Sequence, residues 1–581
     1  MKCTIGSRLL VFCALVSFII GCDSDPKVTA SKTEVDQIVV RLPEEPESFS
    51  PFHTSSTLGR QVYANMYNTL ADYDYQTLEL RPVLLVDLPT VERLSDGRTK
   101  YTMTLKRDAV WEDGSPVTAH DVFWTIKIIF HPGVVLPSLR AQYADIEEFV
   151  IDVQDDRTFS IITSSKKFLE KDIILNTDIY PKAVYDSKGV LDKYDLATLK
   201  ALEPPVEDED LAQLGSDFES ITYIKEKAGG SGPYRLENYQ NGQFVVLKKK
   251  EDYWGANYPE VDQLNQYPDR IIYQFVPDGT TALTLLKNQE IDFMDFSHRS
   301  SAAYYDDLKE DSLMSSLFKF EDVVNPRFVS ILLNHEDPKL ADKSVRRALR
   351  YMIDVDRVIN QLQRGNGQRQ IGPVHMSKPQ YNKNIQPENY NPEKAKEILD
   401  AAGWIDSDGD GVRDKIVDGR KLDLEFTWHI SGSTFSVGLG TMASEVGKDV
   451  GIKIEMIEKP TSTTVSENIY PGDYDLYGTI KTQSVIKDDL YLYFHSSSIG
   501  GGQDNLIRYS NPEVDKLVET IRATDDEEIR QQAYLKVQEV LYEDVDAIYL
   551  YSPVLKIVHA ADISPALSSR RPGYYMNSED K

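Results

Sequence analysis

Alternating apolar and polar residues mark several short stretches of the chain as half-buried β-strands. In "TKYTMTLKR" (residues 99–107), Tyr101, Met103 and Leu105 alternate with polar neighbours. The stretch "KLDLEFTWHI" (421–430) alternates over its whole length, with Trp428 on the apolar face. The same pattern predicts further strands in "IVVRL", "RTFSIITSS", "GQFVVLKKK", "RIIYQFV" and "GIKIEMIEK".

Other stretches repeat their apolar residues every three or four positions, which is the period of an α-helix. This spacing predicts helices over 58–70 and 345–362. Two more helices have clear starts, because Asn391 and Asn511 each precede a proline that suits the first helical turn. Gly403 is the expected stop of the first of these two. Helices and strands interleave without an internal repeat, so we expect an α/β fold.

The length and the net charge of the chain limit the kinds of protein that it can be. A chain of 581 residues, 41% of them hydrophobic, is long enough for more than one packed unit. It has 93 acidic residues against 64 Lys and Arg, a net charge of −29. Because such a surface repels nucleic acids and anionic lipids, we expect no nucleic-acid partner.

The first 22 residues, "MKCTIGSRLLVFCALVSFIIGC", have the pattern of an export signal. Lys2 and Arg8 precede an apolar run that is too short to span a bilayer comfortably. The ending resembles a bacterial lipobox, in which Cys22 is lipidated, although Ile20 stands where a small residue is preferred. An ordinary signal peptide cut elsewhere is the alternative.

Cysteine usage agrees with the lipobox. The three cysteines are Cys3, Cys13 and Cys22, so the exported chain needs no disulfide and keeps only a lipidated thiol. Residues 23–36 are polar without periodicity and are predicted to be a flexible linker.

A search for catalytic motifs finds none of the metalloprotease, nucleophile-elbow, P-loop or dinucleotide-binding patterns. The nine histidines are scattered, and no cysteine after Cys22 can act as a nucleophile or zinc ligand. The sequence therefore predicts no enzyme. A Ser-His-Asp triad assembled from distant segments is the alternative that would make the protein an exported hydrolase.

The stretch "WEDGSPVTAHDVFW" (111–124) has the residue types of an active site. Its Asp-Gly pair and Pro116 are typical of a turn. Thr118 stands three residues before Asp121, which predicts a capping box at the start of a helix. These roles explain the polar residues without catalysis, so we expect residues 111–124 to have a structural role.

Alternate carboxylates in "DSDGDGVRD" (406–414) resemble the start of a calcium-binding loop. The position of the usual bidentate glutamate holds Val417. A plain Gly/Asp turn is the preferred interpretation, and structural calcium is the alternative. The candidate ligands are Asp406, Asp408, Asp410 and Asp414.

Five blocks of the sequence, in order, have a recognisable pattern. They are "LSDGRTKYTMTLKRDAVWEDGSPVTAHDVFWTI", "SGPYRLENYQNGQFVVLKKKEDYWG", "ALTLLKNQEIDFMD", "LLNHEDPKLADKSVRRALRYMIDVDRVI" and "PEKAKEILDAAGWIDSDGDG". They resemble the family 5 extracellular solute-binding proteins, which are the peptide- and nickel-type receptors of ABC importers. Gln289 replaces the usual glycine in the third block. The resemblance runs from about Ile38 to about Val558.

The resemblance implies a periplasmic-binding-protein-like fold of class II, cluster C type. Two α/β lobes are joined by a hinge, with a ligand cleft between them and a smaller lobe inserted in the first. The expected boundaries are 37–78, 196–296 and 556–581 for lobe I, 79–195 for the inserted lobe II, and 297–555 for lobe III.

The implied function is the substrate-binding component of an ABC transporter. It would capture a peptide or related small solute and deliver it to a membrane permease. The protein would be a monomeric lipoprotein of the bacterial cell envelope, periplasmic or extracytoplasmic, without a cofactor apart from the calcium alternative. A surface adhesion or chaperone lipoprotein is a third interpretation.

The resemblance also implies ligand-binding residues. Trp428 is expected either to line the pocket or to lie in the core. In peptide receptors of the family, a tryptophan and then an aspartate that pairs with the peptide's amino terminus occupy the places held here by Gln483 and Ile486. Two more segments that approach ligand in the family supply Ser55, Ser56, Thr57, Asp295, Phe296 and Ser297.

Because Ile486 cannot pair with a cation, the sequence predicts a ligand without the usual amino-terminal anchor. Candidates are a modified peptide, a sugar-like or opine-like solute, or a metal chelate. A short peptide held by another acid, Asp295, Asp488 or Asp489, is the alternative.

Overall fold

The computed structural model describes most of the chain after residue 36. The signal and linker segments 1–22 and 23–36 lie outside the described residues, as do Cys22, Ser55, Ser297 and Ile486. The described ranges are 37–54, 56–164, 169–220, 225, 227, 229–296, 304–483, 487–500, 504–524 and 526–579.

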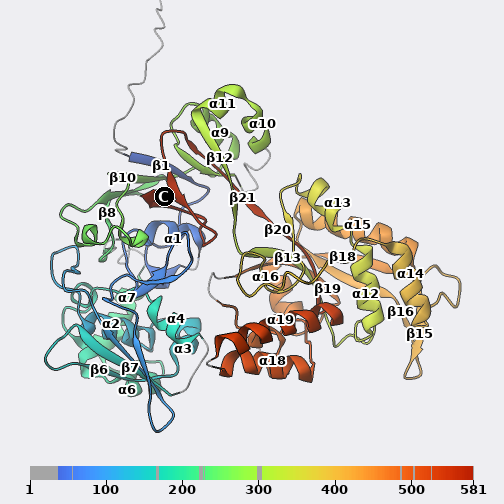
Figure 1. Cartoon of the computed structure of the whole chain (residues 1–581), viewed down its shortest axis with the longest axis horizontal. Coiled ribbons are helices and arrows are strands. Elements are labelled where there is room, and N and C mark those ends of the chain that lie inside the picture. Colours follow the sequence, from blue (N-terminus) through green and yellow to red (C-terminus); the bar gives the residue numbers. More distant parts are fainter. Residues whose placement is uncertain are drawn as a thin grey trace, which may run out of the picture. The chain divides into compact units, whose positions relative to one another are not determined.

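A seven-stranded mixed sheet joins the two ends of the described chain. In Figure 1 its blue strand β1 (Gln37–Leu42) belongs with green strands and the red strand β21 (Val554–Ala560). β1 runs parallel to both neighbours, and the other pairs are antiparallel. The strand order is β12 (Phe318–Val324), β21, β11 (Phe293–Asp295), β1, β10 (Arg270–Phe275), β9 (Phe244–Lys249) and β8 (Tyr234–Gln240).

A six-stranded sheet forms a second core. Its apolar residues pack with those of helices α12 (Lys343–Met352), α14 (Pro392–Ala401) and α15 (Thr434–Val450). The amphipathic spacing of these helices places their apolar faces on the sheet. The strand order is β14 (Gln368–Arg369), β20 (Ala547–Ser552), β13 (Arg327–Leu333), β19 (Leu476–Thr482), β17 (Glu425–Ile430) and β18 (Lys453–Glu458).

Two short connections lead from one sheet to the other. Asn325 and Pro326 join β12 to β13, and Pro553 alone joins β20 to β21. β12 pairs with β21 and β13 pairs with β20, so the connections run next to each other. A few residues of this kind can absorb the backbone rotation of a hinge.

A four-stranded antiparallel sheet packs with helix α2 (Ala119–Ile129). The capping box is confirmed, because the Thr118 N–H donates to the Asp121 carboxylate at 2.9 Å. The stretch 111–124 is therefore a turn and a helix start, as predicted. The strand order is β4 (Thr90–Arg93), β5 (Thr99–Thr104), β7 (Thr158–Thr163) and β6 (Ile146–Ile151).

Three hairpins and further helices complete the described chain. The hairpins are β2 (Ala71–Tyr73) with β3 (Leu80–Pro82), β15 (Asp414–Val417) with β16 (Arg420–Asp423), and β22 (Pro565–Leu567) with β23 (Tyr574–Glu579). The other helices are α1 (Thr57–Tyr63), α3 (Pro137–Tyr143), α4 (Glu170–Leu175), α5 (Lys182–Tyr185), α6 (Leu196–Ala201), α7 (Glu209–Glu219), α9 (Gly279–Lys287), α10 (Tyr305–Glu310), α11 (Ser312–Leu317), α13 (Val355–Arg357), α16 (Thr461–Thr464), α17 (Leu490–Phe494), α18 (Pro512–Ala523) and α19 (Glu527–Asp544).

The predicted α/β class is confirmed, while three predicted elements have different ends. The helix predicted over 58–70 stops at Tyr63, where the Asn65 side chain bonds the Gln61 carbonyl and competes with the helical pattern. The helix predicted over 345–362 is interrupted at Asp354, whose carboxylate caps a new turn at Arg357.

The strand predicted over 421–430 divides at Leu424 because its two halves have different partners. β16 forms a hairpin with β15, whereas β17 pairs with β18 and β19. The alternation of side chains continues across the division, which is why the sequence pattern did not reveal it. None of the described helices combines the length and apolarity that a membrane span requires.

Candidate functional site

A cavity of about 810 Å³ is lined by residues of two stretches of the chain, 73–172 and 326–530. Its lining includes six cationic and three acidic side chains among the described residues. That balance is opposite to the net charge of −29 of the whole chain. The charged lining residues are Arg93, Lys171, Lys378, Lys487, Arg522, Arg530, Glu79, Asp172 and Glu527.

A buried ion pair lies at the edge of this cavity. Lys378 Nζ is 2.7 Å from an Asp488 carboxylate oxygen, with the two side chains 3% and 10% exposed. Burial raises the pKa of Asp488, and burial lowers the pKa of Lys378. Burial also lowers the pKa of the nearby Lys481 ammonium to about 7. Asp489 accepts hydrogen bonds from Arg522 at 2.8 and 3.0 Å. Two of the three carboxylates proposed as substitute anchors, Asp488 and Asp489, therefore already have cationic partners.

The resemblance gives Ser55, Ser56 and Thr57 as ligand-binding residues of one loop. The structure describes Ser56 and Thr57. Ser56 is the N-cap of α1, and its hydroxyl accepts a hydrogen bond from the Gly59 N–H at 3.0 Å. The Thr57 hydroxyl accepts a hydrogen bond from the Arg571 guanidinium. Both side chains thus have structural partners, and contact with ligand stays a prediction for them, as for Ser55.

Asp295 ends β11 next to the strand β21. Its charge acts on the guanidinium groups of Arg41 and Arg327 and raises the pKa of each, opposing the stronger effect of burial. Phe296 is fully buried and packs edge-on against Tyr305, with ring centroids 5.8 Å apart. Its position is that of a core residue, and ligand contact of Phe296 and Ser297 stays a prediction.

Gln483 is buried, and it forms hydrogen bonds next to the connection between β12 and β13. Its side-chain oxygen accepts the His375 N–H at 3.0 Å, and its amide donates to the Pro373 carbonyl at 2.7 Å. Its own N–H donates to the Pro326 carbonyl at 2.6 Å. Both polar atoms of the side-chain amide therefore have partners inside the protein. Ile486, the other residue of this pair, lies outside the described residues.

Trp428 is 1% exposed and belongs to the core of the six-stranded sheet. Its indole N–H is buried and has no hydrogen-bond partner among the residues that the structure describes. The packing is that of a core tryptophan, and a contact with ligand stays a prediction. The structure does not show Trp428 among the residues that line the cavity of 810 Å³.

Sequence reasoning did not single out the arginines that connect the nominated segments. The Arg571 guanidinium donates a hydrogen bond to the Thr57 hydroxyl. Burial lowers the pKa of Arg327, and the charge of Asp295 opposes that shift. A lone arginine has no sequence signature, and these residues are separated by hundreds of positions. Convergence in the fold is what identifies them.

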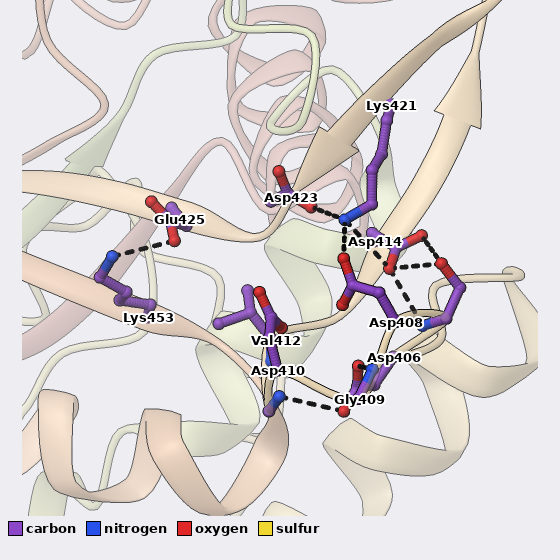
Figure 2. A network of polar contacts seen from close by, with 12 residues as sticks. Asp406, Asp408, Gly409, Asp410, Val412, Asp414, Lys421, Asp423, Glu425 and Lys453 are labelled. Carbon is purple, nitrogen blue, oxygen red and sulfur yellow. Dashed lines mark hydrogen bonds and ion pairs between the residues drawn. The ribbon is translucent and has the colours of Figure 1, made fainter.

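The Asp-rich loop is a closely hydrogen-bonded turn before the hairpin β15–β16 (Figure 2). Asp406 accepts the N–H groups of Gly409 and Gly411 at 2.7 and 3.1 Å, and Asp410 accepts that of Val412 at 2.8 Å. These bonds belong to Asx-type turns and confirm the turn.

A lysine already lies among the carboxylates of this loop. Lys421 Nζ is 2.7 Å from Asp408, 2.8 Å from Asp423 and 3.6 Å from Asp414, as Figure 2 shows. Asp406, Asp408 and Asp414 could offer oxygens within 4.8 Å of one another, the donor type that calcium prefers. The oxygens suit calcium, but the ammonium occupies the position of the cation. Calcium therefore stays a proposal that requires Lys421 to move.

We expect chelator to leave the melting temperature of the wild-type protein unchanged. Lys421→Gln should instead bind calcium with a dissociation constant of about 10⁻⁴–10⁻³ M, because removing the ammonium frees the carboxylates. Calorimetry with CaCl₂ and thermal melting with EDTA check both expectations.

Lys453→Gln is the matched control, since Lys453 pairs with Glu425 at 2.9 Å in the same region but outside the loop. It should gain no calcium binding. A fall in the wild-type melting temperature on adding EDTA would show that a metal is bound despite Lys421.

The middle-part profile of the bacterial extracellular solute-binding proteins, family 5, matches residues 79–503. The oligopeptide-binding protein AppA of Bacillus subtilis is 25% identical over 561 residues, 94% of this chain and 92% of the relative. The dipeptide-binding protein of Escherichia coli is 23% identical over 566 residues, 92% of this chain and 94% of the relative.

Solved structures share the fold. The structure of Bacillus subtilis AppA in complex with a nonapeptide has a TM-score of 0.67 at 23% identity, covering 94% of this chain and 99% of AppA. NikA from Brucella suis in complex with Fe(III)-EDTA has a TM-score of 0.72 at 17% identity, covering 92% and 98%. These neighbours confirm the predicted periplasmic-binding-protein-like fold. With a profile that matches most of its length, the chain belongs to family 5 of the bacterial extracellular solute-binding proteins.

Proposed function

We propose that the protein is the solute receptor of an ABC importer, which captures a peptide or related small solute and delivers it to a membrane permease. The observation that carries the proposal is the family match over residues 79–503. The relatives named for peptide binding span the same length, and the two short connections between the sheets suit closure around a ligand. Binding and delivery account for these features without a catalytic step.

The ligand's amino terminus is not the main anchor in this proposal. Asp488 and Asp489, the acids closest in sequence to the family's anchor, already pair with Lys378 and Arg522. An incoming ammonium would have to displace a buried lysine or an arginine. The existing ion pair would then be broken, which is unfavourable. N-acetylated peptides should therefore bind as well as free ones.

Ligand release from the purified protein tests the proposal. The protein is purified without denaturant, and mass spectrometry identifies the small molecules that unfolding releases. Calorimetry then compares di- to pentapeptides with free and acetylated amino termini. Micromolar binding within three-fold between the two sets is expected. If unfolding releases no solute and no peptide binds, the receptor function is contradicted. Binding that acetylation abolishes would contradict the anchor argument.

Lipid attachment through Cys22 is part of the proposal. It is supported by the Gly-Cys ending of the apolar segment and by the absence of any later cysteine. Cys22→Ala should move the protein from the membrane fraction to the soluble fraction, because no acyl chain can then be attached. Fractionation and immunoblotting measure this.

Cys13→Ala is the matched control, because Cys13 lies within the predicted signal segment and should not affect anchoring. Unchanged membrane association of the Cys22 variant would rule out the lipoprotein. Light scattering of the released protein checks the proposed monomer.

A further inference from the structure

A small cavity of about 30 Å³ lies beside strand β20 of the six-stranded sheet. Its lining comes from α12, β14, α19 and β20 and from the segments that adjoin them. None of these lining residues also lines the cavity of 810 Å³. The small cavity is therefore a separate feature of the fold, away from the cationic lining described above.

Two buried oxygen atoms of this lining have no hydrogen-bond donor among the described residues. They are Asp546 Oδ1 and Gln370 Oε1, and both residues are 1% exposed. The other polar atoms of the two side chains are engaged. Asp546 Oδ2 accepts the Tyr549 hydroxyl at 2.6 Å, and the Gln370 amide donates to the Gly372 and Val374 carbonyls at 2.7 and 2.8 Å. These bonds fix which atom of each side chain is left over, and a buried acceptor without a donor is unfavourable.

The same lining supplies one donor that has no acceptor. It is the Nε–H group of Arg350, which is buried and has no partner within the described ranges. The rest of this guanidinium is engaged, because Nη1 donates to the Tyr542 carbonyl at 2.6 Å and Nη2 pairs with Glu388. The unmatched groups around the cavity are therefore two acceptors and one donor.

We propose that this cavity binds one water molecule, which accepts the N–H of Arg350 and donates to Asp546 and Gln370. Water has two O–H donors and an acceptor oxygen, so it matches all three groups. Buried waters typically make about three such hydrogen bonds and need a cavity of at least about 10–15 Å³. A cation would suit the two oxygens, but it would leave the Arg350 N–H unmatched and would be repelled by the guanidinium.

The proposed water would connect the charges of Arg350 and Asp546. Burial raises the pKa of Asp546 to about 7, and the hydrogen bond from Tyr549 opposes this shift. A water that donates to Asp546 favours its ionised form in the same way. The water would also join Gln370 to the start of β20. This inference does not depend on the proposed function.

A crystal structure of the wild-type protein, at a resolution that shows ordered waters, tests the proposal. We expect one peak of electron density in the cavity, at about 2.5–3.2 Å from Arg350 Nε, Asp546 Oδ1 and Gln370 Oε1. Crystals soaked in rubidium chloride should show no anomalous signal at this peak. An anomalous signal would identify a cation, and direct contact of the two oxygens without a peak would identify a shared proton. Either result overturns the water.

A double-mutant cycle tests the bridge in solution. Asp546→Asn removes the carboxylate, and Gln370→Met removes the amide oxygen. If one water joins the two groups, the loss of the first partner leaves less for the second to lose. The unfolding equilibrium constant of the double variant should therefore rise about 3- to 10-fold less than the product of the two single effects. Urea denaturation measures all three variants.

Gln538→Met is the matched control, because Gln538 of α19 is also buried but does not line the cavity. Its effect should simply multiply with that of Asp546→Asn. Effects that multiply for Asp546 and Gln370 as well, or an equally large coupling in the control, would overturn the bridge.

A second pair keeps the test open if Asp546→Asn does not fold. Arg350→Lys keeps the positive charge but removes the Nε–H group, and its effect should be coupled with that of Gln370→Met. Arg347→Lys is the control for this pair, because Arg347 also pairs with Glu388, at 2.8 Å, but lies outside the cavity lining. Equal coupling of both arginines with Gln370 would overturn the proposal.

Discussion

Replacing Trp428 by alanine is expected to lower the free energy of unfolding by about 3–5 kcal/mol. The indole is 1% exposed and packs in the core shared by β17, β13 and helices α12 and α15. Its removal loses apolar burial and leaves a cavity that the surrounding sheet cannot fill. Urea denaturation of the isolated protein measures the change.

Met456→Ala provides the matched control for this prediction. Met456 is the register partner of Trp428 on β18 but is 37% exposed, so its truncation should cost about 1 kcal/mol or less. If the Trp428 variant instead keeps its stability and loses ligand affinity, the tryptophan lines the pocket. That result would support the alternative that the sequence left open.

Replacing Asp488 by asparagine is expected to cost about 3–5 kcal/mol of stability at pH 7, because it leaves a buried ammonium without its counter-charge. The ion pair with Lys378 spans 2.7 Å, and the lysine side chain is only 3% exposed. Burial alone lowers the pKa of Lys378, so the unpaired lysine tends to lose its proton.

The pH dependence of the Asp488→Asn variant follows from this. Folded Lys378 would then have a lower pKa than unfolded Lys378, so the unfolded state binds more protons and stability rises with pH. The loss of unfolding free energy relative to the wild type should therefore shrink between pH 7 and about pH 10, which is near the ordinary lysine pKa. Combining Asp488→Asn with Lys378→Met should restore most of the lost stability. A double variant as unstable as the single one would show that packing, not charge, is responsible.

Local sequence signals predicted the local structure well. Asn391 caps α14 by accepting the Lys394 N–H at 3.0 Å, and the capping box of Thr118 and Asp121 begins α2. These features depend on residues within one helical turn, so their spacing carries the information. The breaks at Asp354 and Leu424 depend instead on competition with tertiary partners. The spacing of apolar residues along the chain carries no information about such tertiary partners.

The candidate site was less predictable because its contacts connect distant segments. Lys378 and Asp488 are 110 positions apart, and Thr57 and Arg571 are 514 apart. Sequence reasoning named Asp488 as a substitute anchor but could not show the lysine that pairs with it. It likewise proposed carboxylates for calcium without the lysine between them. In both places the residue missed is a cation that the fold supplies.

Lys421 of β16, which pairs with the Asp-rich loop, bears on the conditions in which this hairpin can fold. Lys421 is covalently attached to the hairpin, so it is present beside Asp408 and Asp423 at a high effective concentration that no dilution can lower. A bound metal ion would exchange with the medium and leave when its supply fell. The family is one of extracellular proteins. With a tethered cation, we expect the folding of this hairpin not to depend on the calcium supply of the surroundings.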